Sequence, residues 1–140
     1  MKKIIIFVFS VSLIASCKKD KDTCNQDMAG MSATYRITAA TYKASPTAAE
    51  QDYYNQLFTD PCERDDLLIL NSNGTYTYTD GGVKCVPPGD DTGTWSVNGN
   101  IFTIDGEANT IQSFDCSSLV FTEVDIFVSG DQLKLTLTRQ

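Results

Sequence analysis

The side chains in this sequence that could do chemistry are carboxylates, thiols, hydroxyls and one indole, because the chain contains no histidine. That absence removes the commonest general base and the Ser-His and Cys-His forms of nucleophilic catalysis. Ser117 and Ser118 lie outside any G-x-S-x-G context. The sequence therefore predicts a protein that is not an enzyme, and no motif implies a cofactor.

Carboxylates gather at Glu63, Asp65 and Asp66 and again at Asp90 and Asp91. Grouped carboxylates can bind Ca²⁺ or exchange protons with a substrate. The first group lacks the spacing of an EF-hand loop, and the second follows Pro-Pro-Gly. We expect both groups to be solvated turn residues, and we predict no metal site.

The charge balance is acidic, with a net charge of −7. The basic residues beyond Asp22 are scattered, whereas neutralising phosphates requires clustered Lys and Arg. The sequence therefore argues against nucleic acid as a partner, and nothing in it indicates an oligomeric state.

The N-terminus has the layout of an export signal. Two lysines precede an apolar run over residues 4–15, which is too short to span a bilayer as a helix. Small residues then lead to Cys17 and the segment "KKDKD". This arrangement resembles the lipobox of bacterial lipoproteins, although an ordinary signal peptide cut nearby is the alternative. The resemblance implies a signal peptide over residues 1–16, a lipidated Cys17 opening a tether over 17–27, and a lipoprotein anchored in the outer membrane, facing the periplasm or the cell surface.

Setting Cys17 aside leaves four cysteines, Cys24, Cys62, Cys85 and Cys116. An even number in an exported chain predicts two disulfides, and no C-x-x-C spacing or histidine indicates a metal or redox site. Of the three connectivities we favour Cys62–Cys85, which flanks one hairpin, together with Cys24–Cys116.

Most of residues 28–140 has the pattern of short strands separated by turn residues. Asn73-Gly74 and Asn98-Gly99 are typical of hairpin turns. Eight strands are predicted, over residues 34–43, 67–71, 75–79, 92–97, 100–104, 110–115, 119–128 and 133–139.

One segment has a helical pattern instead. Ser45 and Pro46 form a helix-start signature, and aromatic and leucine residues up to Phe58 recur at helical spacing. We predict one helix over Ser45–Phe58, lying against an end of the sheet or gating a ligand site.

The predicted fold is all-β, an eight-stranded antiparallel up-and-down meander that closes into a barrel. Consecutive antiparallel strands leave exposed edges unless the sheet closes, and about eight strands suffice to close with a small interior.

Residues 60–85, with "NGTYTYT" between two cysteines, and "DTGTWSVNGNIFTI" at 91–104 together resemble the lipocalin-like domain of Bacteroides-group lipoproteins. The resemblance covers residues 28–140, with Tyr35 standing where the family usually has a tryptophan. It implies a calycin-type barrel.

Tyr76 and Tyr78 share one strand face, and Trp95 is the only tryptophan. These three residues are the candidates for lining a ligand pocket. The tyrosines could equally decorate an exposed face, and for Trp95 we favour a core position closing the barrel. The sequence thus favours a binder of a small apolar or amphipathic molecule, and the alternative is a surface or structural lipoprotein that binds a protein or glycan around a solid barrel.

Lipidation at Cys17 is testable by metabolic labelling with palmitate. We expect the full-length chain to be labelled and the Cys17→Ala variant to carry no label, because the thiol is the acceptor atom. Label that persists in Cys17→Ala would exclude the anchor.

Overall fold

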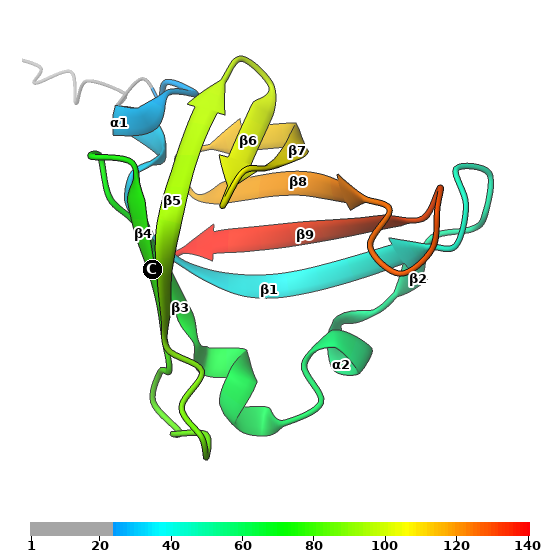
Figure 1. Ribbon diagram of the computed structural model, residues 1–140, viewed down its shortest axis with the longest axis horizontal. Helices are drawn as coiled ribbons and strands as arrows, with labels where there is room; N and C mark the ends of the chain where they lie inside the picture. Colours follow the sequence, from blue (N-terminus) through cyan, green and yellow to red (C-terminus); the bar gives the residue numbers. More distant parts are fainter. Residues whose placement is uncertain (1–23) are drawn as a thin grey trace, which may run out of the picture.

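The computed structural model describes residues 24–140, which form an eight-stranded antiparallel barrel in meander order (Figure 1). The predicted fold class is therefore confirmed. The barrel closes because β1 pairs with β9 as well as with β3, so the first and last long strands are neighbours. Closure gives every strand of the barrel two partners, which removes its free edges. Cys17 and the predicted signal peptide lie outside the described residues.

The eight barrel strands match the eight predicted segments, with ends shifted by a few residues. They are β1 (Ala33–Lys43), β3 (Leu67–Leu70), β4 (Thr75–Thr79), β5 (Asp91–Asn98), β6 (Ile101–Ile104), β7 (Glu107–Asp115), β8 (Ser118–Val124) and β9 (Gln132–Arg139). A ninth, two-residue strand, β2 (Gln51–Asp52), pairs with the far end of β1 outside the barrel.

The alternation along each strand decides which side chains face inward. Leu133, Leu135 and Leu137 on β9 are buried, while Lys134 between them is half-exposed. On β4 the tyrosines face inward. Tyr76 lies opposite Leu70 of β3, and Tyr78 lies opposite Leu68. The pairing register of β1 with β9 shifts between Ile37 and Ala39. Ile37 packs on the core before the shift and Ala40 is buried after it, so the strand presents side chains to the interior on both sides of the shift.

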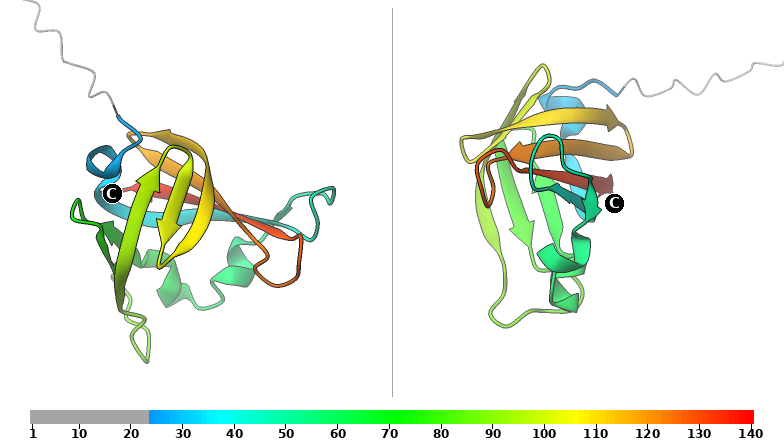
Figure 2. Two further views of the ribbon diagram at one scale, coloured as in Figure 1. Left: turned by 45° about the horizontal axis from the view of Figure 1, so that its top comes forward. Right: turned by 90° about the vertical axis from the view of Figure 1, so that its right-hand side faces the viewer.

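One end of the barrel is closed by a short helix that the sequence did not predict, α1 (Met28–Met31). Met31 is buried, and its carbonyl accepts a hydrogen bond from the Tyr35 hydroxyl at 2.8 Å. Arg139 ties the same end together by donating to the carbonyls of Gly30, Ser32 and Cys116. In Figure 2 (right), α1 lies at the opposite end of the barrel from the short helices that follow β2.

The helix predicted over Ser45–Phe58 is wrong in its extent. Residues 45–48 form a turn, 51–52 form β2, and only α2 (Tyr54–Leu57) is helical, followed by the 3₁₀ helix η1 (Pro61–Asp65). The reason is that β3 pairs with only the first three residues of β1, so the backbone groups at its far end need another partner. Residues 51–53 supply it, ending with the bond from the Tyr53 amide to the Ala40 carbonyl at 2.9 Å.

The strand predicted to run to Val128 also ends early, at Val124. Asp131 is buried, and its carboxylate accepts hydrogen bonds from the amides of Ile126, Phe127 and Val128, which draws these residues out of the sheet into a loop. The second predicted hairpin turn lies one residue later, at 99–100, because Asn98 still pairs with Ile101.

The other end of the barrel is surrounded by the connections 44–66, 80–90, 105–106 and 125–131. We call it the open end. No helix among residues 24–140 is long and apolar enough to cross a membrane.

Gly93 on β5 provides a test of packing at the open end. A Cβ there would lie 2.1 Å from Asp105 Oδ1 and 2.6 Å from Tyr76 Cε1. Gly93→Ala should therefore lower the free energy of unfolding by about 1–3 kcal/mol, the usual range for overpacking, as measured by urea denaturation. Gly89→Ala is the control, since its Cβ would find only Asp66 Oδ2, at 3.9 Å. Equal stability of the two variants would contradict this packing.

Candidate functional site

A cavity of about 310 Å³ occupies the open half of the barrel. Its walls come from seven of the eight barrel strands and from the 80–90 connection. The lining residues are Ile37, Leu68, Tyr76, Tyr78, Gly89, Asp91, Ile104, Phe121, Glu123 and Leu135. We call this cavity the lumen pocket. Its volume is at the lower end of the range for small-molecule sites, and a mostly apolar wall with a few polar groups is what such sites share.

Tyr76 and Tyr78, two of the three candidates from the sequence, line the lumen pocket. The Tyr76 hydroxyl donates a short hydrogen bond to Asp105 Oδ2, and this bond, followed by burial, raises the pKa of Tyr76 to about 12. Asp105 also accepts from the Thr94 amide at 2.9 Å, so one carboxylate joins the β6–β7 turn to β4 and β5. Tyr76 is therefore held as a neutral wall of the pocket.

Tyr78 lies close to the acidic residues Asp66 and Glu63. Burial raises the pKa of its hydroxyl, and the neighbouring Asp66 carboxylate raises it further. The phenol stays protonated in the physiological range. Tyr78 also lines an adjoining cavity of about 290 Å³ beside Leu57 and Phe58, so it stands between the lumen and the short helices.

Glu123 is a polar residue of the lumen pocket that was not predicted from the sequence. It lies on β8 two residues after Phe121, on the same inward face, and the alternation of β8 was the available signal. Burial raises the pKa of its carboxyl group. Asp91 is the other acid of the lining, and no Lys, Arg, Ser or Cys contributes to it.

The comparison with known families agrees with this architecture. A family model described as a lipocalin-like domain matches residues 31–135. The chain belongs to the lipocalin-like domain family. Members of this family are mostly binding proteins rather than enzymes. No curated protein and no solved structure matches the chain.

In this lipocalin-like barrel Trp95 is a core residue. It is 3% exposed, packs its ring 6.1 Å from that of Phe102, and donates from Nε1 to the Asn71 carbonyl at 2.9 Å. Phe102 in turn packs 5.1 Å from Phe121. This aromatic row forms the floor below the lumen pocket, and Trp95 is not among the residues that line it.

The four cysteines among residues 24–140 lie in two pairs. Cys62 and Cys85 form a disulfide that joins η1 to the 80–90 connection, the pairing favoured from the sequence. Cys24 and Cys116 are neighbours at the closed end as thiols in hydrogen-bond contact, so a disulfide between them stays a prediction. Burial, with the added effect of Cys116, raises the pKa of the Cys24 thiol to about 11, which makes it a poor nucleophile at neutral pH.

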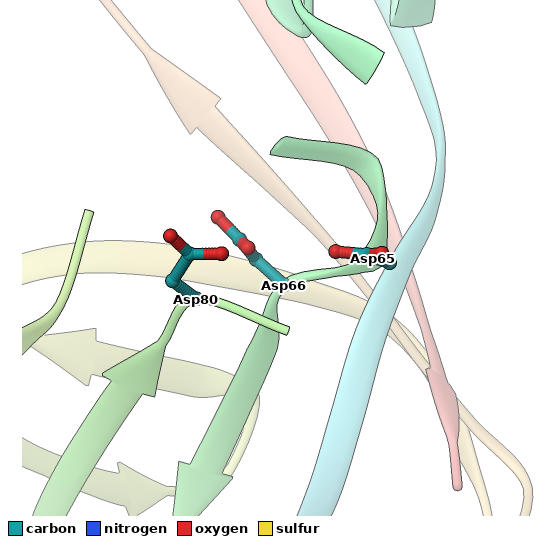
Figure 3. Close-up of side chains that lie close together, drawn as sticks. All are labelled: Asp65, Asp66 and Asp80. Carbon is teal, nitrogen blue, oxygen red and sulfur yellow. The ribbon is translucent and has the colours of Figure 1, made fainter. Parts of the chain in front are cut away.

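The acidic residues are placed differently from expectation. Asp65 and Asp66 lie beside Asp80, with one carboxylate oxygen of each within 4.8 Å of the others (Figure 3). Asp66 is 6% exposed and Asp80 is 2% exposed, so the prediction of a solvated turn residue is wrong for Asp66. Asp80 escaped notice because its burial depends on the "DGG" segment folding back over η1, which strand patterns do not reveal.

The raised pKa of Glu123 gives a pH-dependent stability. Because the unfolded chain titrates near the ordinary value of 4.5 and the folded chain above it, deprotonation destabilises the fold as pH rises through the folded pKa. Glu123→Gln should therefore be more stable than the parent chain at pH 7, and this advantage should shrink towards pH 4, as measured by urea midpoints.

The control for that experiment is Glu107→Gln, which changes an exposed glutamate on β7. A Glu123→Gln advantage that is the same at both pH values, or a loss of stability at pH 7, would show that the Glu123 carboxylate is not desolvated.

Proposed function

We propose that this lipocalin-like protein binds a small amphipathic molecule in the lumen pocket, with an apolar tail and a neutral or cationic head. The single observation that carries the proposal is the lining of the pocket. Apolar side chains from Ile37 to Leu135 surround two phenols and two carboxylates, and no basic side chain is present to receive an anionic head. A carboxylate or phosphate head would meet Asp91 and Glu123 without a counter-charge, which is unfavourable in a partly buried site.

The connections at the open end also carry exposed apolar side chains. The 80–90 and 125–131 connections at the open end carry the exposed side chains of Val83, Val86, Phe127 and Val128. Phe127 rests against the rings of Tyr42 and Tyr53, at 5.6 and 5.9 Å. These side chains give the open end apolar surface that favours a ligand with an apolar tail.

We also propose that the lumen pocket has no catalytic role. The lining offers no thiol, amine or serine hydroxyl as a nucleophile. The phenols have raised pKa values, so they act as hydrogen-bond donors instead of bases.

We further propose that the barrel is held at the outer membrane by a lipidated Cys17 and the charged tether that follows it. The support is the sequence pattern of residues 1–22. The described chain begins beside α1 at the closed end, so such an anchor leaves the open end with its lumen facing away from the attachment point.

Competition against a neutral fluorescent probe, N-phenyl-1-naphthylamine, tests the ligand class on the full-length chain in a non-ionic detergent. Octylammonium, octanol and octanoate share one tail and differ in the charge of the head. We expect octylammonium and octanol to displace the probe and octanoate to be the weakest competitor. Glu123→Gln should weaken octylammonium by about threefold to tenfold, as the loss of one partly screened charge pair would.

Two variants on neighbouring residues of β6 locate the binding. Ile104→Trp fills the lumen pocket, whereas Thr103→Trp adds the same ring on the outer face of the strand. Probe binding should be lost in the first and kept in the second. Equal binding by both variants would refute the lumen as the site, and no probe binding at all would favour a surface lipoprotein that recognises a protein or glycan.

A further inference from the structure

The cluster of Asp65, Asp66 and Asp80 lies outside the lumen pocket, where η1, the start of β3 and the end of β4 meet (Figure 3). One carboxylate oxygen from each residue lies within 4.8 Å of the other two. Like charges held this close repel each other unless a counter-ion or a proton lies among them. Something in this site therefore has to offset the charge.

No basic side chain of residues 24–140 forms an ion pair with the cluster. Of residues 24–140, only Lys134 and Glu50 form an ion pair, and they lie on the outer face of the barrel. The Lys84 ammonium contacts the main-chain carbonyl of Asp80 instead of a carboxylate. The cluster is thus an all-oxygen group with a net negative charge.

Backbone amides satisfy only part of the cluster. The amides of Val83 and Cys85 donate to Asp65 Oδ2 and Asp80 Oδ2, each at 2.8 Å, and the Gly81 amide donates to Asp66 Oδ1 at 3.0 Å. The remaining oxygens of Asp65 and Asp80, both named Oδ1, are buried and have no hydrogen-bond partner in the described chain. Asp80 is almost completely buried, with an exposed fraction of 2%. An unpartnered carboxylate oxygen at this depth is costly, and it indicates a ligand.

The chain is also shaped to hold the three residues together. A Cβ at Gly81 would lie 2.1 Å from the Asp65 carbonyl oxygen, and one at Gly82 would lie 3.1 Å from Asp65 Oδ2. The two glycines let the segment after β4 wrap closely around Asp65. The Cys62–Cys85 disulfide fixes the same two segments to each other.

We propose that Asp65, Asp66 and Asp80 form a binding site for a divalent hard cation, with Ca²⁺ as the best match. Carboxylate oxygens select hard cations over thiolate- or imidazole-seeking metals. With three carboxylates whose other oxygens are partly engaged, the affinity belongs with the weaker calcium sites, at Kd on the order of 10⁻⁴–10⁻³ M. This site does not depend on the lumen ligand, although Asp66 lies near enough to Tyr78 of the lumen wall to raise the pKa of its hydroxyl.

Calorimetric titration of the EDTA-stripped, full-length chain in non-ionic detergent with CaCl₂ and MgCl₂ tests the proposal. We expect one Ca²⁺ site, weaker binding of Mg²⁺, and a rise in Tm of about 5–10 °C in ~10 mM Ca²⁺, which follows from mass action at such a Kd. Asp80→Asn and Asp65→Asn should each weaken Ca²⁺ binding at least tenfold, while the charge-matched control Glu107→Gln should leave it unchanged.

A second prediction distinguishes cation binding by the three carboxylates from a purely structural role. Without Ca²⁺, Asp80→Asn should be at least as stable as the parent chain, because the amide removes one repelling charge and keeps an acceptor for the Cys85 amide. Asp65→Asn, at the less buried position, decides the question if Asp80→Asn fails to fold. The proposal would be overturned if Ca²⁺ binding were unchanged in these variants. It would also be overturned if the parent chain bound no Ca²⁺ up to ~10 mM, a concentration well above the expected Kd.

Discussion

The pairing of β1 with β9 is the constraint on which the rest of this structure depends. Eight residue pairs, from Tyr35 opposite Arg139 to Lys43 opposite Gln132, join the first and last strands of the barrel into one closed sheet. Closure separates an inside from an outside, and the alternation of each strand then assigns every side chain to one of them. Without it, Leu133, Leu135 and Leu137 would lie on an open sheet with one uncovered face, and no lumen would exist.

The closed barrel is then divided along its axis into a packed half and a half that holds the lumen pocket. The half near α1 is filled by Met31, Tyr35, Trp95 and Phe102, which are almost fully buried. The side chains of the other half, Tyr76, Tyr78 and Phe121 among them, surround the lumen pocket instead of filling it, and two of the connections at that end are joined by the Cys62–Cys85 disulfide. Stability and binding thus occupy different ends. The packed floor holds the most fully buried side chains, and the open end combines acids, a cavity and exposed apolar loops.

Strand patterns in the sequence predicted the architecture well because β-strand alternation is a local signal that closure does not change. The strand over Thr75–Thr79 and the Cys62–Cys85 pairing followed from neighbouring turn residues and hairpin geometry. The segment 45–58 could not be predicted in the same way, since its helix-start residues compete with the unpaired end of β1, a partner made by tertiary folding. Propensity was outweighed there by backbone hydrogen bonding.

The site was accessible to prediction only in part. Tyr76 and Tyr78 were candidates because they share a face, but the sequence left open whether that face was inside. Trp95 faces the same interior and lies at the packed end, and nothing in its immediate neighbours distinguishes the two ends. Glu123 and Asp80 are acids in strand or turn contexts that usually face solvent. Their burial depends on contacts between segments far apart in the chain.

The most direct test of the lumen as the binding site is an amide and indole NMR titration of the ¹⁵N-labelled chain with octylammonium. The account predicts the largest shifts at the amides of Tyr78, Gly89 and Glu123, around the pocket, while the Trp95 indole signal beneath the aromatic floor stays in place. Shifts concentrated on outward-facing residues such as Thr77 and Lys134, with the pocket amides unmoved, would contradict it.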